Sequence, residues 1–143
     1  MCLIENDIKP IGDIFYKVFL EKEGKLYWCT RDATGKYLNP ETERDEIPDG
    51  RLTSTEIGFH CWDKEEDAQT YAKLLSILLP GLLKNYSLVV KRVRVSYLIK
   101  SGTCPCGAIN QDEKDRWEIL TIVGYGNQVR KQVFTFKYIE GIL

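Results

Sequence analysis

The feature that most constrains the fold is an amphipathic pattern that runs from Asp63 to Pro80-Gly81. Asp63 is a good helix N-cap, and Glu66 stands three residues later, where it completes a capping box. Pro80-Gly81 ends the pattern because proline cannot continue a helix. Between these signals, apolar residues recur with the spacing of one helical face: Ala68, Tyr71, Ala72, Leu75, Leu78 and Leu79. The pattern predicts one helix whose buried face packs against another element.

Strand-like segments precede the predicted helix. Residues 14–20 alternate between two faces, and a turn at 23–25 leads into a returning strand over 25–30, so this part predicts a hairpin. Residues 57–62 form another apolar strand, which is entered through Gly58. One face of the first strand carries Ile14, Tyr16, Val18 and Leu20.

A long polar segment separates the hairpin from the strand at 57–62. Residues 31–55 contain spaced glycines and prolines and predict a connecting loop, with a short strand around 36–38. Loops of this length in a compact domain are usually functional or mobile.

Strand patterns also follow the helix, at 87–100, 117–123 and 129–139, and the segment between the first two predicts a loop that begins near Gly102. Lys91 interrupts the apolar face of the first strand, which predicts a bulge or a strand end near it. That apolar face comprises Val89, Val93, Val95, Tyr97 and Ile99, the opposite face Arg92, Arg94 and Ser96, and the last strand alternates Phe134, Phe136 and Tyr138.

The order of strands, one helix and further strands predicts an α+β fold with a mainly antiparallel sheet and the helix packed on one face. We expect one domain over residues 1–143, with a loose N-terminal segment at 1–12. The hydrophobic fraction of 43% and charged fraction of 29% are those of a globular protein. We expect a cytoplasmic protein without a membrane partner, because no signal peptide is recognisable and the longest apolar stretch, 74–83, is too short to span a bilayer.

The five cysteines are an odd number without a disulfide-framework spacing, and in a reducing compartment they are expected to be thiols. We therefore expect no metal and no cofactor. The alternative is a zinc site, since thiolates are good zinc ligands, but the cysteines of the Cys-Pro-Cys turn are closer together than in a zinc knuckle. Its ligands would be Cys29, Cys61, Cys104 and Cys106.

His60 is the single histidine and so the first candidate for acid–base chemistry, although it can equally hold the strand-to-helix corner by hydrogen bonding. A second candidate site is a basic strip on neighbouring strands, with Tyr97 or Tyr125 available for stacking against bases. The net charge of −1 argues against a dedicated nucleic-acid binder, and the strip can equally be a solvated sheet face. The strip would contain Arg92, Arg94, Arg130, Lys131 and Lys137, and Trp62 is a further binding candidate.

Several short motifs resemble small uncharacterised proteins of bacteriophages and bacterial mobile elements. Those proteins also open with a Tyr-Lys-Val strand and have a Gly-Phe-His corner ahead of an Asp-Ala-x-x-Tyr-Ala helix. The resemblance implies an accessory role. The matching pieces are Tyr16–Phe19, Gly58–Trp62, Asp67-Ala68, Tyr71-Ala72 and Val89–Val95.

The same layout is distantly similar to the ADP-ribosyltransferase fold, in which strands and a helix surround NAD. This similarity implies a NAD-using enzyme that acts through His60, Tyr71 and the late-strand Glu118. Lys17 stands where that fold has an arginine or a histidine.

No complete catalytic set is visible in the sequence. We therefore expect a small accessory binding module that engages another macromolecule, most simply a protein. A NAD-using enzyme and a nucleic-acid-binding sheet surface are the alternatives.

Overall fold

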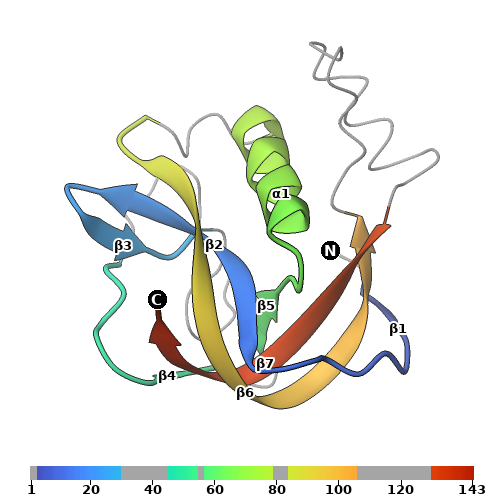
Figure 1. Ribbon diagram of the computed structural model, residues 1–143. Coiled ribbons are helices and arrows are strands. Elements are labelled where there is room, and N and C mark those ends of the chain that lie inside the picture. The colour runs from blue at the N-terminus through green and yellow to red at the C-terminus, as the bar shows by residue number, and fades with distance from the viewer. Residues whose placement is uncertain (1–2, 30–44, 55–56, 79–83, 106–129) are drawn as a thin grey trace.

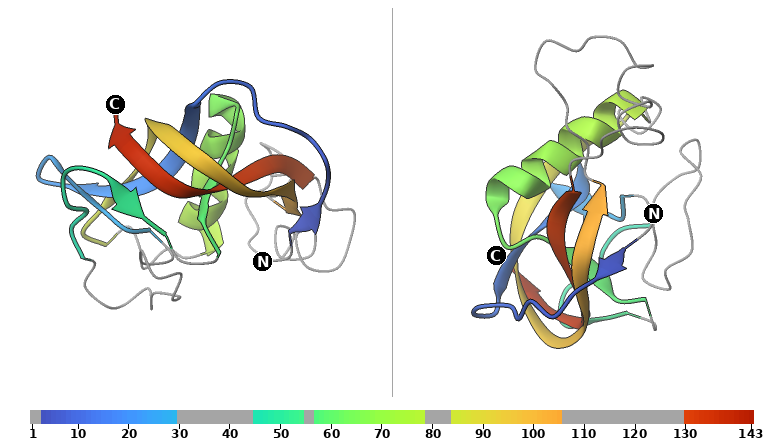
Figure 2. Two further views of the ribbon diagram at one scale, coloured as in Figure 1. Left: turned by 90° about the horizontal axis from the view of Figure 1, so that it is seen from below. Right: turned by 90° about the vertical axis from the view of Figure 1, so that its right-hand side faces the viewer.

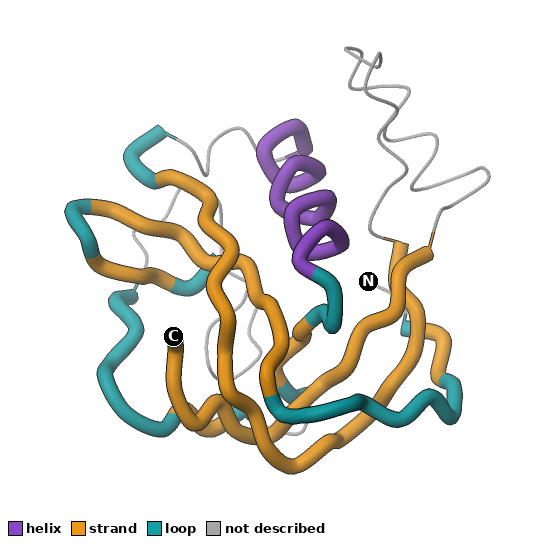
Figure 3. Tube along the Cα trace, viewed as in Figure 1, coloured by secondary structure: helices purple, strands orange, loops and turns teal. Residues whose placement is uncertain are grey.

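The computed structural model describes residues 3–29, 45–54, 57–78, 84–105 and 130–143. They form an α+β fold with a curled antiparallel sheet and one helix, as predicted (Figure 3). The elements are β1 (Ile4–Glu5), β2 (Ile14–Lys22), β3 (Lys25–Tyr27), β4 (Leu52–Thr53), β5 (Phe59–Cys61), α1 (Glu65–Leu78), β6 (Ser87–Pro105) and β7 (Arg130–Ile142). Within these ranges, no helix is long and apolar enough to cross a membrane. The predicted strands at 36–38 and 117–123 lie outside the described residues.

The sheet curls so that the end of β5 meets β2. Its main strand order is β3-β2-β6-β7-β4, and β5 also pairs with β7. Trp62, directly after β5, exchanges two backbone hydrogen bonds with Tyr16 of β2, at 2.8 and 2.9 Å. The strands β2, β6, β7 and β5 therefore form a closed circuit, and Figure 1 shows the strong bend that β6 and β7 need to complete it.

Two apolar clusters lie on the two faces of the curled sheet. The inner core receives residues from β2, β4, β5, β6 and β7 but none from α1, and includes Phe15, Phe59 and Phe134. The helix-side core lies between α1 and the sheet and includes Val18 and Trp62. Because β2 contributes to both clusters, it is buried on both faces, and its predicted alternation describes only the face toward the helix.

The helix α1 packs on one face of the sheet, as predicted (Figures 1 and 2). It begins at Glu65, and Lys64 O accepts the first helical hydrogen bond, so Lys64 occupies the N-cap position predicted for Asp63. Asp67 in the first turn is buried and pairs with Lys131 of β7 across 3.5 Å, which links the helix to the sheet. The buried residues of the helix are Asp67, Ala68, Ala72, Leu74 and Leu75, with Tyr71 partly buried.

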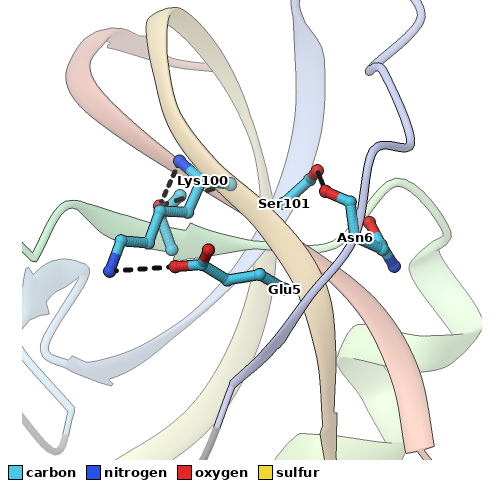
Figure 4. Close-up of polar contacts among 5 residues, drawn as sticks. Glu5, Asn6, Lys100 and Ser101 are labelled. Carbon is cyan, nitrogen blue, oxygen red and sulfur yellow. Dashed lines mark hydrogen bonds and ion pairs between the residues drawn. The ribbon is translucent and has the colours of Figure 1, made fainter.

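The strand β6 continues to Pro105 and therefore includes the segment around Gly102 that the sequence predicted as a loop. At Gly102, an added Cβ would lie 2.4 Å from Ile4 O, so only glycine lets β1 approach this closely. The Asn6 backbone exchanges hydrogen bonds with Ser101, and Glu5 pairs with Lys100 across 3.2 Å (Figure 4). The N-terminal segment is thus held against β6 at residues 4–6, inside the range 1–12 for which the sequence predicts a loose segment.

The irregular part of β6 is not where the sequence predicted it. Lys91 pairs regularly with Lys17 of β2, whereas the register between β6 and β7 shifts at Arg94/Val95 and again at Leu98/Lys100. The alternation of faces therefore changes between these shifts: Leu98 packs against the inner core, and Tyr97 points to solvent. The predicted placement of Tyr97 on the face of Val93 was wrong for this reason.

Candidate functional site

The bend of β6 presents an exposed tyrosine on a strained backbone. Tyr97 lies between the two register shifts, has a φ of 63° and is 68% exposed. A left-handed conformation costs a non-glycine residue roughly 1–2 kcal/mol, and such residues are concentrated at functional sites. Tyr97 contributes nothing to either core that offsets this cost.

Three residues from β7 and the segment before β4 gather around Tyr97. The ring of Tyr138 meets that of Tyr97 edge-on, with centroids 6.3 Å apart and planes at 78°. Lys137 Nζ lies 5.5 Å from the Tyr97 centroid and 5.3 Å from the Tyr138 centroid. Arg51 Cζ lies 3.7 Å above the Tyr138 ring. We call Tyr97, Tyr138, Lys137 and Arg51 the tyrosine patch.

The carboxylate of Glu140 borders the tyrosine patch. It accepts hydrogen bonds from Arg51 Nε and Ser96 Oγ, each at 2.7 Å. The bond from Ser96 is the largest cause of a lowered pKa at Glu140; desolvation opposes it, and Arg51 adds to it. Glu140 is therefore ionised at neutral pH, and it fixes the guanidinium of Arg51 over the Tyr138 ring.

Tyr138 joins the patch because β7 also changes face. Its neighbour Phe136 belongs to the inner core, and strict alternation would place Tyr138 there as well. Ile139 takes that place instead, and the register shift opposite Arg94/Val95 accommodates Glu140 as an extra residue in β7. The predicted alternation through Tyr138 was therefore wrong at this residue.

The inner face of the sheet contains a second unusual group, the ammonium of Lys17. Lys17 Nζ donates a hydrogen bond to His60 O at 3.0 Å and lies 5.8 Å from the Phe59 centroid. Desolvation lowers the pKa of Lys17, against the opposing effect of nearby Cys61 and Cys29. Burial raises the pKa of the Cys61 thiol to about 11, against the opposing charge of Lys17. Cys61 is therefore a protonated, poorly nucleophilic thiol at neutral pH.

Two of the three residues predicted for catalysis, His60 and Tyr71, lie in the described part of the chain. His60 pairs with Thr135 of β7, and its carbonyl binds Lys17. Tyr71 packs on Trp62, with ring centroids 4.7 Å apart, in the helix-side core. Glu118 lies outside the described residues.

The predicted basic strip is divided between the two ends of the β6–β7 ladder. Arg94 lies opposite Gly141 and pairs with Asp13 across 3.5 Å; Arg92 nearby is exposed. At the other end, Arg130 binds Thr103 and Lys131 pairs with Asp67.

Two further predicted site groups are buried. Trp62, predicted as a binding residue, is only 2% exposed. Cys61 belongs to the inner core, whereas Cys29 and Cys104 belong to the helix-side core; Cys106 lies outside the described residues. Across the described ranges, no three His, Cys, Asp or Glu residues are grouped so that they could hold a metal ion.

A shallow groove of about 440 Å³ lies between α1 and the start of β6. It is open to solvent and mixed in character, without the convergent buried polar groups of a typical small-molecule site. Its lining residues are Gln69, Ala72, Lys73, Ser76, Tyr86, Ser87 and Leu88.

Comparison of the chain with protein-family models, with curated proteins and with solved structures finds no match. The resemblances to phage proteins and to the ADP-ribosyltransferase fold therefore stay predictions.

The tyrosine patch is the site that sequence reasoning missed in part. Lys137 was predicted in the basic strip and Tyr97 as a stacking residue beside it, whereas Tyr138 was predicted on the face of Phe134 and Phe136, and Arg51 was not predicted in a site. The sequence signal was the pair of aromatic and basic residues Lys137-Tyr138 late in the last strand. These two residues indicate a surface site only because β6 places Tyr97 opposite them.

Proposed function

We propose that this chain is a small binding module that engages another protein through the tyrosine patch. The observation that carries the proposal is Tyr97, a large aromatic residue that is 68% exposed on a left-handed backbone. A costly conformation that presents a side chain to solvent supports a role outside folding.

The composition of the patch supports a protein partner. Tyrosine and arginine are enriched among the residues that dominate protein–protein binding energy, and tyrosine offers a large contact area with few rotatable bonds. In this patch, Arg51 is held by Glu140 and by the ring of Tyr138, so it is largely preorganised.

A single-stranded nucleic acid is the second candidate, because the exposed Tyr97 ring could stack on a base beside Lys137. Two observations favour the protein. The acidic side chains of Glu140 and Asp13 lie beside the cations Arg51 and Arg94, and would repel a phosphate backbone that followed them.

The test is site-specific photo-crosslinking. A benzoylphenylalanine replaces Tyr97 in one protein and the exposed Glu65 at the start of α1 in a control, and both are irradiated in an extract of cells that produce the chain. We expect a discrete protein adduct from position 97 and none from position 65. Equal labelling at the two positions, or no protein adduct at 97, would refute the proposal.

A parallel measurement separates the nucleic-acid candidate. The fluorescence anisotropy of a labelled oligothymidine is followed at low salt with the wild type and with Tyr97→Ala. We expect no binding that depends on Tyr97. Binding that Tyr97→Ala abolishes would replace the protein partner with a nucleic acid.

A further inference from the structure

Lys137 lies at the centre of the tyrosine patch, and within the described part of the chain it has no acidic partner. Its ammonium lies close to both aromatic rings, 5.5 Å from the Tyr97 centroid and 5.3 Å from the Tyr138 centroid. Among the described residues, no carboxylate forms an ion pair with it. Contact with aromatic rings removes part of the water around an ammonium, which strengthens its attraction for an added anion.

The charges of the patch do not balance. Arg51 and Lys137 both approach the ring of Tyr138, and Glu140 is the acid that pairs with Arg51. Among the described residues of the patch and its border, two cations and one carboxylate leave one positive charge. A partner carboxylate beside Lys137 would form a second ion pair in the patch, in addition to the existing pair of Arg51 and Glu140.

From these contacts we infer that the tyrosine patch binds an acidic segment of a partner protein, with a carboxylate on Lys137 and an apolar or aromatic side chain on the exposed ring of Tyr97. The inference rests on the proposed function and specifies the chemistry of the partner. A carboxylate fits better than a run of phosphates because the patch has a single uncompensated charge beside the fixed carboxylate of Glu140.

The experiment uses a random peptide library displayed on phage and panned against the immobilised full chain. The wild type should enrich peptides that combine Asp or Glu with an aromatic residue. The enriched peptides are then synthesised, and their Kd is measured by fluorescence anisotropy for the wild type and the variants.

The deciding variant is Lys137→Glu, which reverses the charge. It should raise the Kd of the acidic peptides by about tenfold or more, and higher salt should raise the wild-type Kd. The Lys137→Gln variant, which only removes the charge, should have a smaller effect. The matched control is Lys22→Glu, since Lys22 also lies over a tyrosine ring, 5.6 Å from the Tyr86 centroid, but away from the patch. It should leave the Kd unchanged, and circular dichroism should show that all variants are folded.

Two results would overturn the inference. One is enrichment of peptides without acidic residues, and the other is an equal loss of binding in Lys137→Glu and Lys22→Glu. If position 97 still crosslinks a protein and Lys137→Glu does not reduce that adduct, the acidic partner is refuted while the binding module stands. If position 97 crosslinks no protein, the proposed function itself fails.

Discussion

Tyr97 combines a left-handed backbone with a large side chain that contacts neither core. Glycine is the residue that adopts such a φ without a steric cost, so a tyrosine here is unfavourable for folding. Where function rather than packing selects a side chain, we expect its removal to improve the stability of the fold and to impair binding.

Substituting Tyr97 tests this trade-off. Both Tyr97→Gly and Tyr97→Ala remove the ring, but only glycine relieves the strained φ of 63°. We expect the glycine variant to be more stable than the alanine variant by about 1 kcal/mol, as measured by urea unfolding.

The control pair for this comparison is Ser96→Gly and Ser96→Ala, at the preceding residue, which does not have a positive φ. There the order should reverse, because glycine weakens an ordinary strand. An alanine variant at position 97 that matched or exceeded the glycine variant in stability would show that the backbone is not strained.

Lys17 and Cys61 make the stability of the inner core depend on pH in opposite directions. The raised pKa of Cys61 means that the folded state keeps its proton longer than the unfolded state does. The stability that Cys61 contributes is therefore complete below its unfolded pKa of 9.0 and is lost as the pH rises through about 11. For Lys17 the lowered pKa means that the folded state loses its proton first, so its contribution grows as the pH rises.

The free energy of unfolding measured from pH 9 to about 11 should separate the two groups. The Cys61→Ala variant should lose less stability than the wild type over this range, by about 2 kcal/mol, because no buried thiol is left to ionise. The Lys17→Met variant should lose more than the wild type, since the opposing contribution of Lys17 is gone. Parallel pH profiles for the wild type and both variants would contradict this account.

At the scale of single elements, Gly58 determines how β5 enters the sheet. It has a φ of +82°, and an added Cβ would lie 2.9 Å from Ile99 Cδ1, 3.1 Å from Thr135 Cβ and 3.2 Å from Phe136 O. Gly58 is therefore needed both for its backbone conformation and for the close approach of β6 and β7.

The variants Gly58→Ala and Gly24→Ala separate these two requirements. Gly24 has a similar φ of +78°, but an added Cβ there would meet no atom within 4 Å. We expect Gly24→Ala to cost about 1 kcal/mol from backbone strain alone, and Gly58→Ala to cost about 2–4 kcal/mol because packing strain is added. Thermal unfolding gives both values, and equal losses would show that the contacts around Gly58 relax freely.

The helix shows which elements follow from local sequence. Its buried face at Ala68, Tyr71, Ala72 and Leu75 was predicted because a periodic pattern is a property of neighbouring residues. The two-residue β1 was not predicted, because its pairing depends on the distant Gly102 and on the room that this glycine leaves.

At the scale of the whole molecule, closure of the sheet joins residues that are far apart in the chain. The closing contact links Tyr16 to Trp62, β4 pairs with β7, and β1 pairs with the far end of β6. Each of these contacts closes a long loop in the chain. The conformational entropy of that loop is lost before the contact can contribute stabilising energy, so this cost falls early in folding.

We therefore expect slow folding, on the order of milliseconds to seconds, which is typical of proteins dominated by non-local strand pairs. Stopped-flow refolding from urea, followed by tryptophan fluorescence, measures the rate, since Trp28 and Trp62 are buried in the two cores. Refolding within microseconds would show that local structure, chiefly α1 and the β2–β3 hairpin, controls folding instead.

The sequence by itself determined the fold class, the β2–β3 hairpin, the helix and its buried face, because each depends on periodicity, turns and caps within a few residues. It also placed Phe134 and Phe136 correctly on one buried face of β7. Only the tertiary structure decided where β6 and β7 shift register, and therefore that Tyr97 and Tyr138 leave the core and meet Lys137 at the surface. Register depends on how two distant strands fit around a curled core, and one residue of shift reverses every side chain beyond it.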